Sequence, residues 1–148
     1  MATQFVSIFD KFTPMITDAT LLLDEFTIDE ASLSHYLNLA VQITLISVPL
    51  TLKSKLETID IIANEFTTDL TIQEEYIVAS AMRPHWIQPF ISDTDYLLTA
   101  TGGTRDYSEG SHANLLEKMV NLKKEYEEEI DGVLIAYSID NGELSGLA

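Results

Sequence analysis

The stretch LLEKMVNLKKEYEEEIDGVLIAY, residues 115–137, decides the fold class. Its apolar side chains recur every three or four residues, at Leu115, Met119, Leu122, Tyr126, Ile130, Val133 and Tyr137. This spacing places them on one face of an α-helix and leaves the charged side chains on the rest of its surface. We therefore predict a long C-terminal helix with Ser108 or Ser111 as its N-cap. Gly132 favours an early end, because glycine inside a helix costs about 1 kcal/mol relative to alanine.

Two further helix starts have the form of a capping box, in which a threonine and a glutamate three residues later each bond the other's backbone amide. They are Thr27-Ile28-Asp29-Glu30 and Thr71-Ile72-Gln73-Glu74. The helix after the first box should stop before Pro49, because the residue before a proline avoids helical geometry. The helix after the second should run to about Arg83 and kink at Pro84, which lacks a backbone donor.

The N-terminal residues also have helical spacing, with Phe5, Ile8, Phe9 and Phe12 on one face. We predict a helix near 3–12, an interruption at Pro14 and a short helix near 15–25. Within residues 48–70, the β-branched runs Val48–Leu52 and Thr58–Ile62 could pair as a small hairpin or form loop and helix pieces, and we expect the segment to be irregular.

The remaining segments predict connections. We expect a turn over 93–98, a flexible loop over 99–110 that contains Gly102 and Gly103, and a tail over 138–148 without periodicity. The fold class is therefore mostly α: a small helical bundle with a long C-terminal helix and an extended C-terminal tail. We expect one domain over 1–130, with 131–148 as a helix end and tail that partners order.

The net charge of the chain excludes several classes of function. The chain has 24 acidic and 8 basic residues, a net charge of −16. Phosphate binding needs lysine and arginine, yet only Lys118, Lys123 and Lys124 cluster, and glutamates surround them. A conventional nucleic-acid binder and binding to an anionic membrane are therefore not expected. The charge either serves solubility alone or keeps a surface off DNA or paired with a basic partner.

Composition points to one folded, cytosolic domain. Of the 148 residues, 46% are hydrophobic and none is cysteine, which excludes disulfides and thiolate metal sites. The N-terminus lacks the pattern of a signal peptide. Residues 31–52 have no formal charge, but Ser34, Asn38 and Gln42 form a polar stripe on a helix, so we do not expect a membrane span.

Motifs for chemistry are weak. Glu109-Gly110-Ser111-His112 has the Glu-x-x-His spacing of di-iron bundles, but only once. Asp93-Thr94-Asp95 lacks the later residues of a calcium loop, and Thr101-Gly102-Gly103-Thr104 lacks the lysine of a phosphate loop. Glu127–Glu129 is typical of a solvated helix face, and Trp86 of core packing. We expect no enzyme, no metal and no cofactor.

The order of several segments resembles the head-to-tail connector, or adaptor, proteins of tailed bacteriophages. Glu75-Tyr76-Ile77 leads into Trp86-Ile87-Gln88-Pro89, and a polar loop precedes Tyr107-Ser108 and Ser111-His112-Ala113-Asn114-Leu115-Leu116 before the long charged helix. In that family a small-Ala-Asn-x-Leu segment often opens the long helix. The likeness covers roughly 70–130 and, more loosely, 1–47, where the Phe5–Phe12 stretch and Ile16-Thr17-Asp18 carry it. Residues 48–70 and the tail depart from it.

The resemblance implies a structural protein of the virion neck, made in the host cytoplasm, that assembles as a ring, a dodecamer, beneath the portal protein. The ring would receive stopper or tail proteins and extend a channel through which DNA passes without specific binding. An acidic lining suits such a channel, because carboxylates repel phosphates. The segments 99–110 and 131–148 have the least reason to fold alone, so we predict that they contact partners. From them we predict the contact residues Thr101, Gly102, Gly103, Arg105, Tyr137, Ile139, Leu144 and Leu147.

Two alternatives stay open. The first is an acidic helical protein that masks a basic partner, in the manner of a DNA mimic. The second is a metal-dependent helical-bundle enzyme that uses His112.

Overall fold

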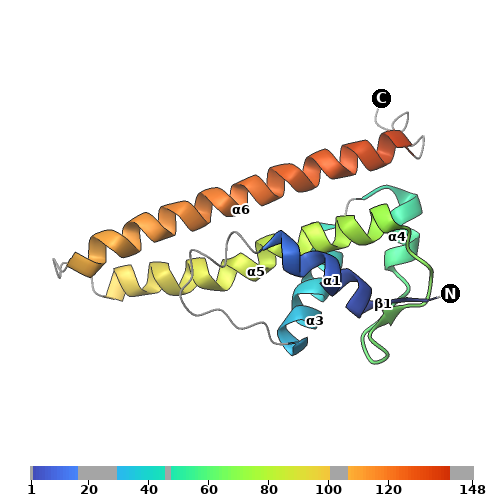
Figure 1. The fold of residues 1–148 in the computed structure, drawn as a ribbon, viewed down its shortest axis with the longest axis horizontal. Coiled ribbons are helices and arrows are strands. Elements are labelled where there is room, and N and C mark those ends of the chain that lie inside the picture. Colours follow the sequence, from blue (N-terminus) through green and yellow to red (C-terminus); the bar gives the residue numbers. More distant parts are fainter. Residues whose placement is uncertain (1, 17–29, 46–47, 101–106, 141–148) are drawn as a thin grey trace.

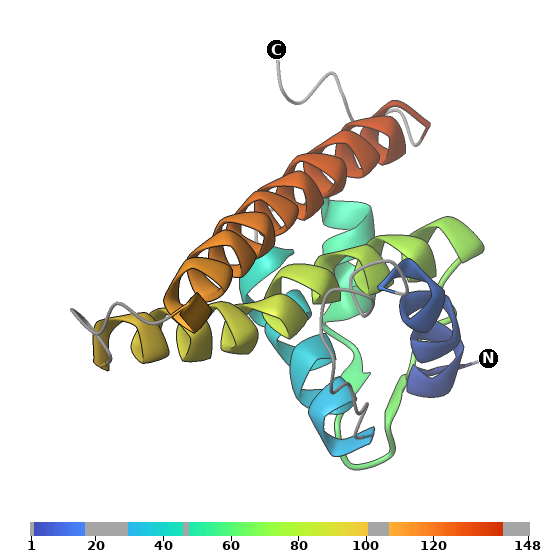
Figure 2. The same ribbon diagram turned by 60° about the vertical axis from the view of Figure 1, so that its left-hand side comes forward.

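The computed structural model describes residues 2–16, 30–45, 48–100 and 107–140. Within them the protein is mostly helical, as the sequence predicts, with one small sheet. Two long helices, α5 (Ile72–Ala100) and α6 (Tyr107–Asp140), run alongside each other in opposite directions (Figure 1). The N-terminal elements gather around the first half of α5, and its second half extends beyond them with α6 (Figures 1 and 2).

The apolar stripe of the C-terminal sequence is the face by which α6 packs. Met119, Tyr126, Ile130 and Tyr137 are buried. Leu115, Leu122 and Val133 are partly buried against the same core. The prediction of this stripe is confirmed, because apolar side chains at helical spacing leave water together when the helix lies on α5.

The core also includes buried side chains of α5 and of the shorter helices, which are α1 (Phe5–Met15), α3 (Glu30–Leu39) and α4 (Leu50–Leu56). Phe5, Ile8 and Phe12 are buried on one face of α1, as the spacing predicts. Residues 40–44 form η1 (Ala40–Thr44), a single π-helical stretch in which the Leu45 amide donates to the Ala40 carbonyl at 2.9 Å. Such π-helical turns are rare in proteins overall, but those that occur are often at functional sites.

A three-stranded antiparallel sheet lies beside α1. Its strands are β1 (Thr3–Gln4), β2 (Ile59–Asp60) and β3 (Glu65–Phe66), in the order β1-β3-β2. Phe66 pairs with Thr3 on one side and with Ile59 on the other. Residues 48–70 thus hold a short helix followed by a hairpin. The hairpin pairs 59–60 with 65–66 and not the two predicted β-branched runs, of which the first lies mostly in α4.

The predicted helix stop before Pro49 is confirmed, because the helical residues 30–44 end before it, but Pro14 does not interrupt α1. Pro14 lies in the last turn of α1, where it removes one hydrogen bond and the helix still reaches Met15. Pro84 and Pro89 lie inside α5, which continues to Ala100. The predicted turn over 93–98 is therefore wrong. The predicted 15–25 helix and the first capping-box threonine fall largely outside the described residues.

The long C-terminal helix is longer than predicted at both ends. It includes Tyr107, so Ser108 and Ser111 lie inside it and neither is the residue before it. Gly132 does not end it, and residues 138–140 are helical rather than part of a tail. A stripe that packs along α5 outweighs one glycine, since its cost is only about 1 kcal/mol. Within the described ranges, no helix has both the length and the apolar character that a bilayer crossing requires.

Candidate functional site

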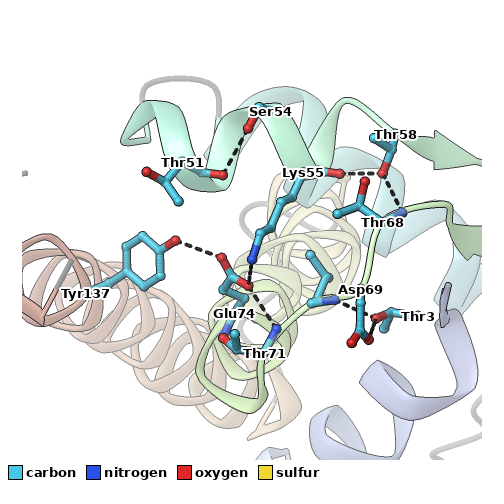
Figure 3. Close-up of polar contacts among 11 residues, drawn as sticks. Thr3, Thr51, Ser54, Lys55, Thr58, Thr68, Asp69, Thr71, Glu74 and Tyr137 are labelled. Atoms are coloured by element: carbon cyan, nitrogen blue, oxygen red, sulfur yellow. Dashed lines mark hydrogen bonds and ion pairs between the residues drawn. The ribbon is translucent and has the colours of Figure 1, made fainter. Parts of the chain in front are cut away.

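The carboxylate of Glu74, in the first turn of α5, accepts hydrogen bonds from three parts of the described structure (Figure 3). Its residue is 1% exposed. Oε1 accepts hydrogen bonds from Lys55 Nζ at 2.7 Å and from the Thr71 amide at 2.8 Å. Oε2 accepts one from the Tyr137 hydroxyl at 2.7 Å. This carboxylate therefore joins α4, the start of α5 and the end of α6.

The capping box places Glu74 where it can do this. The Thr71 hydroxyl accepts from the Glu74 amide at 3.2 Å, and the Glu74 carboxylate accepts from the Thr71 amide. The predicted box is confirmed in both directions. The reciprocal bonds turn the glutamate inward at the helix start, and Lys55 and Tyr137 meet it there.

The protonation state of Glu74 follows from these donors. Burial desolvates the carboxylate and by itself raises its pKa, but the bonds from Lys55, Thr71 and Tyr137 outweigh burial. The net pKa of Glu74 lies below its ordinary value. An ionised carboxylate with donors on both oxygens is poorly suited to general acid or base catalysis, so we assign this cluster to holding the helices together.

Neighbouring polar contacts connect α1 and β1 to the start of α5. Glu75 accepts from Ser7 Oγ at 2.6 Å and pairs with Lys11 at 2.9 Å, which fixes α1 to α5. The Thr3 hydroxyl accepts from the Leu70 amide at 2.7 Å, so the first strand is tied to the residues that lead into α5. Figure 3 shows Thr3 beside the chain that enters α5.

A second buried cation, Arg83, compensates for Pro84. A proline at 84 leaves the Ser80 carbonyl without its helical donor, and Arg83 Nε donates to that oxygen at 3.2 Å. Nη1 pairs with Glu129 at 2.7 Å, and the guanidinium lies 4.6 Å from the centre of the Tyr126 ring. This arrangement attaches α6 to the middle of α5 and uses the cation internally.

His85 lies at an open hollow of about 320 Å³ between η1, α5 and α6. Its Nε2 is 2.6 Å from the Thr44 hydroxyl. Burial lowers the pKa of His85 below its ordinary value, and the nearby charges of Lys123 and His35 lower it further. The hollow is lined by Thr44, Pro84, His85, Lys123, Glu127, Ile130, Asp131 and Leu134. No three potential metal-ligating side chains converge in the described part of the chain, this hollow included.

The distribution of charge is the feature of the surface that bears most on function. Among the described residues, four cations are wholly or partly buried, and each pairs with a carboxylate: Lys11 with Glu75, Lys55 with Glu74, Arg83 with Glu129 and Lys123 with Glu127. Exposed carboxylates then dominate α6, at Glu117, Glu125, Glu127, Glu128, Glu129, Asp131 and Asp140. Internal pairing offsets the charge of these four cations, and the other described cations, Lys53, Lys118 and Lys124, are exposed but outnumbered by the exposed carboxylates.

The structure describes two of the predicted contact residues. Tyr137 is 2% exposed and bonded to Glu74, so it belongs to the interior and is not available as a surface contact. Ile139 is 56% exposed and directly precedes Asp140, whose carboxylate accepts from Gln73 at 3.1 Å. Thr101, Gly102, Gly103, Arg105, Leu144 and Leu147 lie outside the described residues.

Sequence reasoning missed the partners of three polar groups, Glu74, Arg83 and His85. Glu74 is recognisable from the sequence as a capping residue, but Lys55 and Tyr137 are 19 and 63 positions away from it. Arg83 next to a proline is a weak local signal for a carbonyl that needs a donor. The Thr44–His85 contact has no local signal.

In comparisons with known proteins, no protein-family model, no curated protein and no solved structure matches this chain.

Proposed function

We propose that this protein is a structural virion component that forms a ring between the portal and the tail of a tailed bacteriophage and extends the DNA channel. The supporting observation is the charge arrangement. The partly or wholly buried cations are paired internally, and the exposed surface of α6 is rich in carboxylates. A surface of this kind repels DNA phosphates, so DNA slides past it without being held.

The long α5–α6 pair supports the same proposal. It extends beyond the N-terminal elements, so a helical surface is available to neighbouring subunits (Figure 1). A heterologous contact between copies, repeated with a closing rotation, generates a ring. The order of segments resembling the adaptor family supplies the position of that ring, between the portal protein and the stopper or tail proteins.

The first experiment is a pull-down of the tagged chain from a lysate of its native source, with mass spectrometry of the recovered proteins. Recovery of a portal protein together with tail-side proteins supports the proposal, and imaging of the complex then gives the ring symmetry. A single basic partner without virion components supports the alternative, an acidic protein that masks that partner. A chain recovered alone contradicts both.

A charge-matched pair of variants tests the channel lining in the recovered complex. The first carries Glu117→Lys, Glu125→Lys, Glu128→Lys and Asp131→Lys, all at exposed positions of α6. The control carries Asp10→Lys, Glu57→Lys, Asp93→Lys and Asp95→Lys, exposed positions on other elements or the far end of α5. Each set changes the net charge by four times +2, from −16 to −8. We expect only the α6 set to make the assembled complex retain double-stranded DNA in a filter-binding assay. Equal retention by both sets contradicts an α6 lining.

A further inference from the structure

The turn between β2 and β3, residues 61–64, forms a tip that we call the hairpin tip. Ile62 is 97% exposed, the highest value among the large apolar side chains of the described residues, and Ile61 is 54% exposed. Two adjacent isoleucines held in water are unfavourable unless something covers them.

The hairpin tip is ordered in advance. Asp60 Oδ1 accepts from the amides of Ile62 at 3.0 Å and Ala63 at 3.1 Å. Asn64 has a φ of 56°, in the left-handed region that asparagine tolerates, and its carbonyl accepts from the Phe5 amide at 2.9 Å. Strand β3 is paired on both sides, and the Phe66 ring lies 5.6 Å from that of Phe5. A tip held in this way loses little conformational entropy on binding.

A hollow of a size and chemistry that suit such a tip lies at the base of the same hairpin, where Ile59 of β2 helps to line it. It encloses about 260 Å³ between η1, α4 and β2, and we call it the η1–α4 hollow. Leu45 and Leu56, both buried, contribute its apolar floor with Val41 and Ile59. Its rim is polar and is formed by Gln42, Lys53 and Glu57.

We propose that the hairpin tip of one copy of this chain docks into the η1–α4 hollow of a second copy. The isoleucines match the apolar floor in chemistry. Asp60 and Glu65 flank the tip. Lys53 on the rim is exposed, has no ion pair among the described residues and can receive one of these carboxylates, while Glu57 on the same rim repels the other. An anionic lipid surface would repel the same two carboxylates, which argues against membrane insertion of the tip.

The proposed contact is head-to-tail, with the tip of each copy in the hollow of the next copy. Contacts of this type close into rings or extend into filaments. The place of the contact in a neck ring rests on the proposed function, but the contact itself needs no portal protein. The isolated chain therefore tests it separately from the pull-down.

Cysteine cross-linking tests the contact directly, since the chain has no cysteine of its own. Ile62→Cys and Gln42→Cys are made singly, mixed at high concentration and oxidised. We expect a disulfide-linked heterodimer on a non-reducing gel. The control pair, Ile62→Cys with Glu117→Cys, places the second thiol on the exposed surface of α6 and should cross-link far less. Equal yields from the two pairs overturn the proposal.

A second measurement uses sedimentation equilibrium. Ile62→Asp should weaken self-association by roughly tenfold or more, because the variant brings a charge to an apolar floor. The control Ile72→Asp changes another isoleucine, 77% exposed, on α5 and should leave association unchanged. Circular dichroism confirms that both variants fold. A wild-type chain that stays monomeric at high concentration overturns the proposal, as does equal weakening by both variants. Self-association with no portal recovered in the pull-down would retain this contact and reject the neck assignment.

Discussion

At the scale of single residues, the protein uses buried charge to connect helices that are far apart in sequence. Glu74 receives a lysine from α4, an amide from its own helix start and a tyrosine from the end of α6. Removing one partner of a buried, hydrogen-bonded charge costs more than the pair contributes, because the remaining group stays desolvated. These residues therefore determine stability more than their surface counterparts do.

Glu74→Gln should destabilise the protein by about 1.5–3 kcal/mol, because Lys55 and Tyr137 lose a charged acceptor. The measurement is urea unfolding followed by circular dichroism. Glu117→Gln, at an exposed position of α6, is the control and should change the unfolding midpoint little. Equal midpoints for the two variants would show that the Glu74 cluster contributes no stability.

His85 should make the protein less stable in mild acid. Its folded pKa lies below the ordinary value of 6.5, so the unfolded chain takes up a proton that the folded chain resists. His85 does not lower the free energy of unfolding above about pH 6.5, but that free energy falls as the pH drops below this value. Unfolding free energies at about pH 7.5 and 5.5 should differ less in His85→Gln than in the wild type. The same loss in both proteins would assign the effect to other groups. The pKa of Glu74 is also lowered, but Glu74 affects stability only at pH values below its ordinary pKa of 4.5.

At the scale of elements, α6 shows which local signals packing overrides. The helix passes through Gly132, although glycine disfavours helices, because side chains on both sides of it pack on α5. Likewise α5 contains Pro84 and Pro89, and the Arg83 side chain replaces the donor missing at one of them.

Gly132→Ala should stabilise the protein by about 1 kcal/mol, because alanine is the better helix former. An added Cβ would meet no atom within 4 Å, so there is no steric cost to offset the gain. The check is a rise in Tm. Ala136→Gly, at an exposed position one turn later, is the reverse control and should lower Tm by a similar amount. A lowered Tm for Gly132→Ala would mean that the glycine has a role in packing or assembly.

Leu122→Pro should unfold the protein, because proline in a helix interior costs about 3 kcal/mol or more and the stripe would no longer lie on α5 as one surface. Far-ultraviolet circular dichroism measures the loss of helix. A variant with native helix content would show that α6 forms independent halves on either side of residue 122.

At the scale of the whole molecule, the C-terminal end of α6 is part of the fold. Tyr137 closes the Glu74 cluster, and Val133 and Leu134 pack against the core. From sequence we expected residues 131–148 to be ordered by partners, yet residues 131–140 already make contacts within the chain.

Two truncations separate these segments. A chain that ends at residue 130 should have a much lower Tm than the full chain, because it loses the Tyr137–Glu74 bond and the apolar contacts of the last helical turns. A chain that ends at residue 140 keeps all of these contacts and should retain nearly the full Tm. Similar Tm values for the two truncations would contradict a structural role for residues 131–140.

The sequence by itself determined the helical class, the packed face of α6, the packed face of α1 and the capping box at Thr71. Each of these depends on residues at most a few helical turns apart, and local periodicity or local hydrogen bonding decides them. It also determined the acidic balance of the surface, because charge follows from composition alone.

Only the tertiary structure decided how the prolines and Gly132 were accommodated, which acids were buried and which cations they bind. Lys55, Glu74 and Tyr137 meet because three separate helices pack together, and no local pattern encodes that meeting. The same holds for Ile61 and Ile62, which have the composition of a buried strand but lie at the tip of a hairpin whose neighbours supply all the pairing. Burial is a property of the assembled chain, and so the groups that matter most for stability and contact became visible only when the helices were in place.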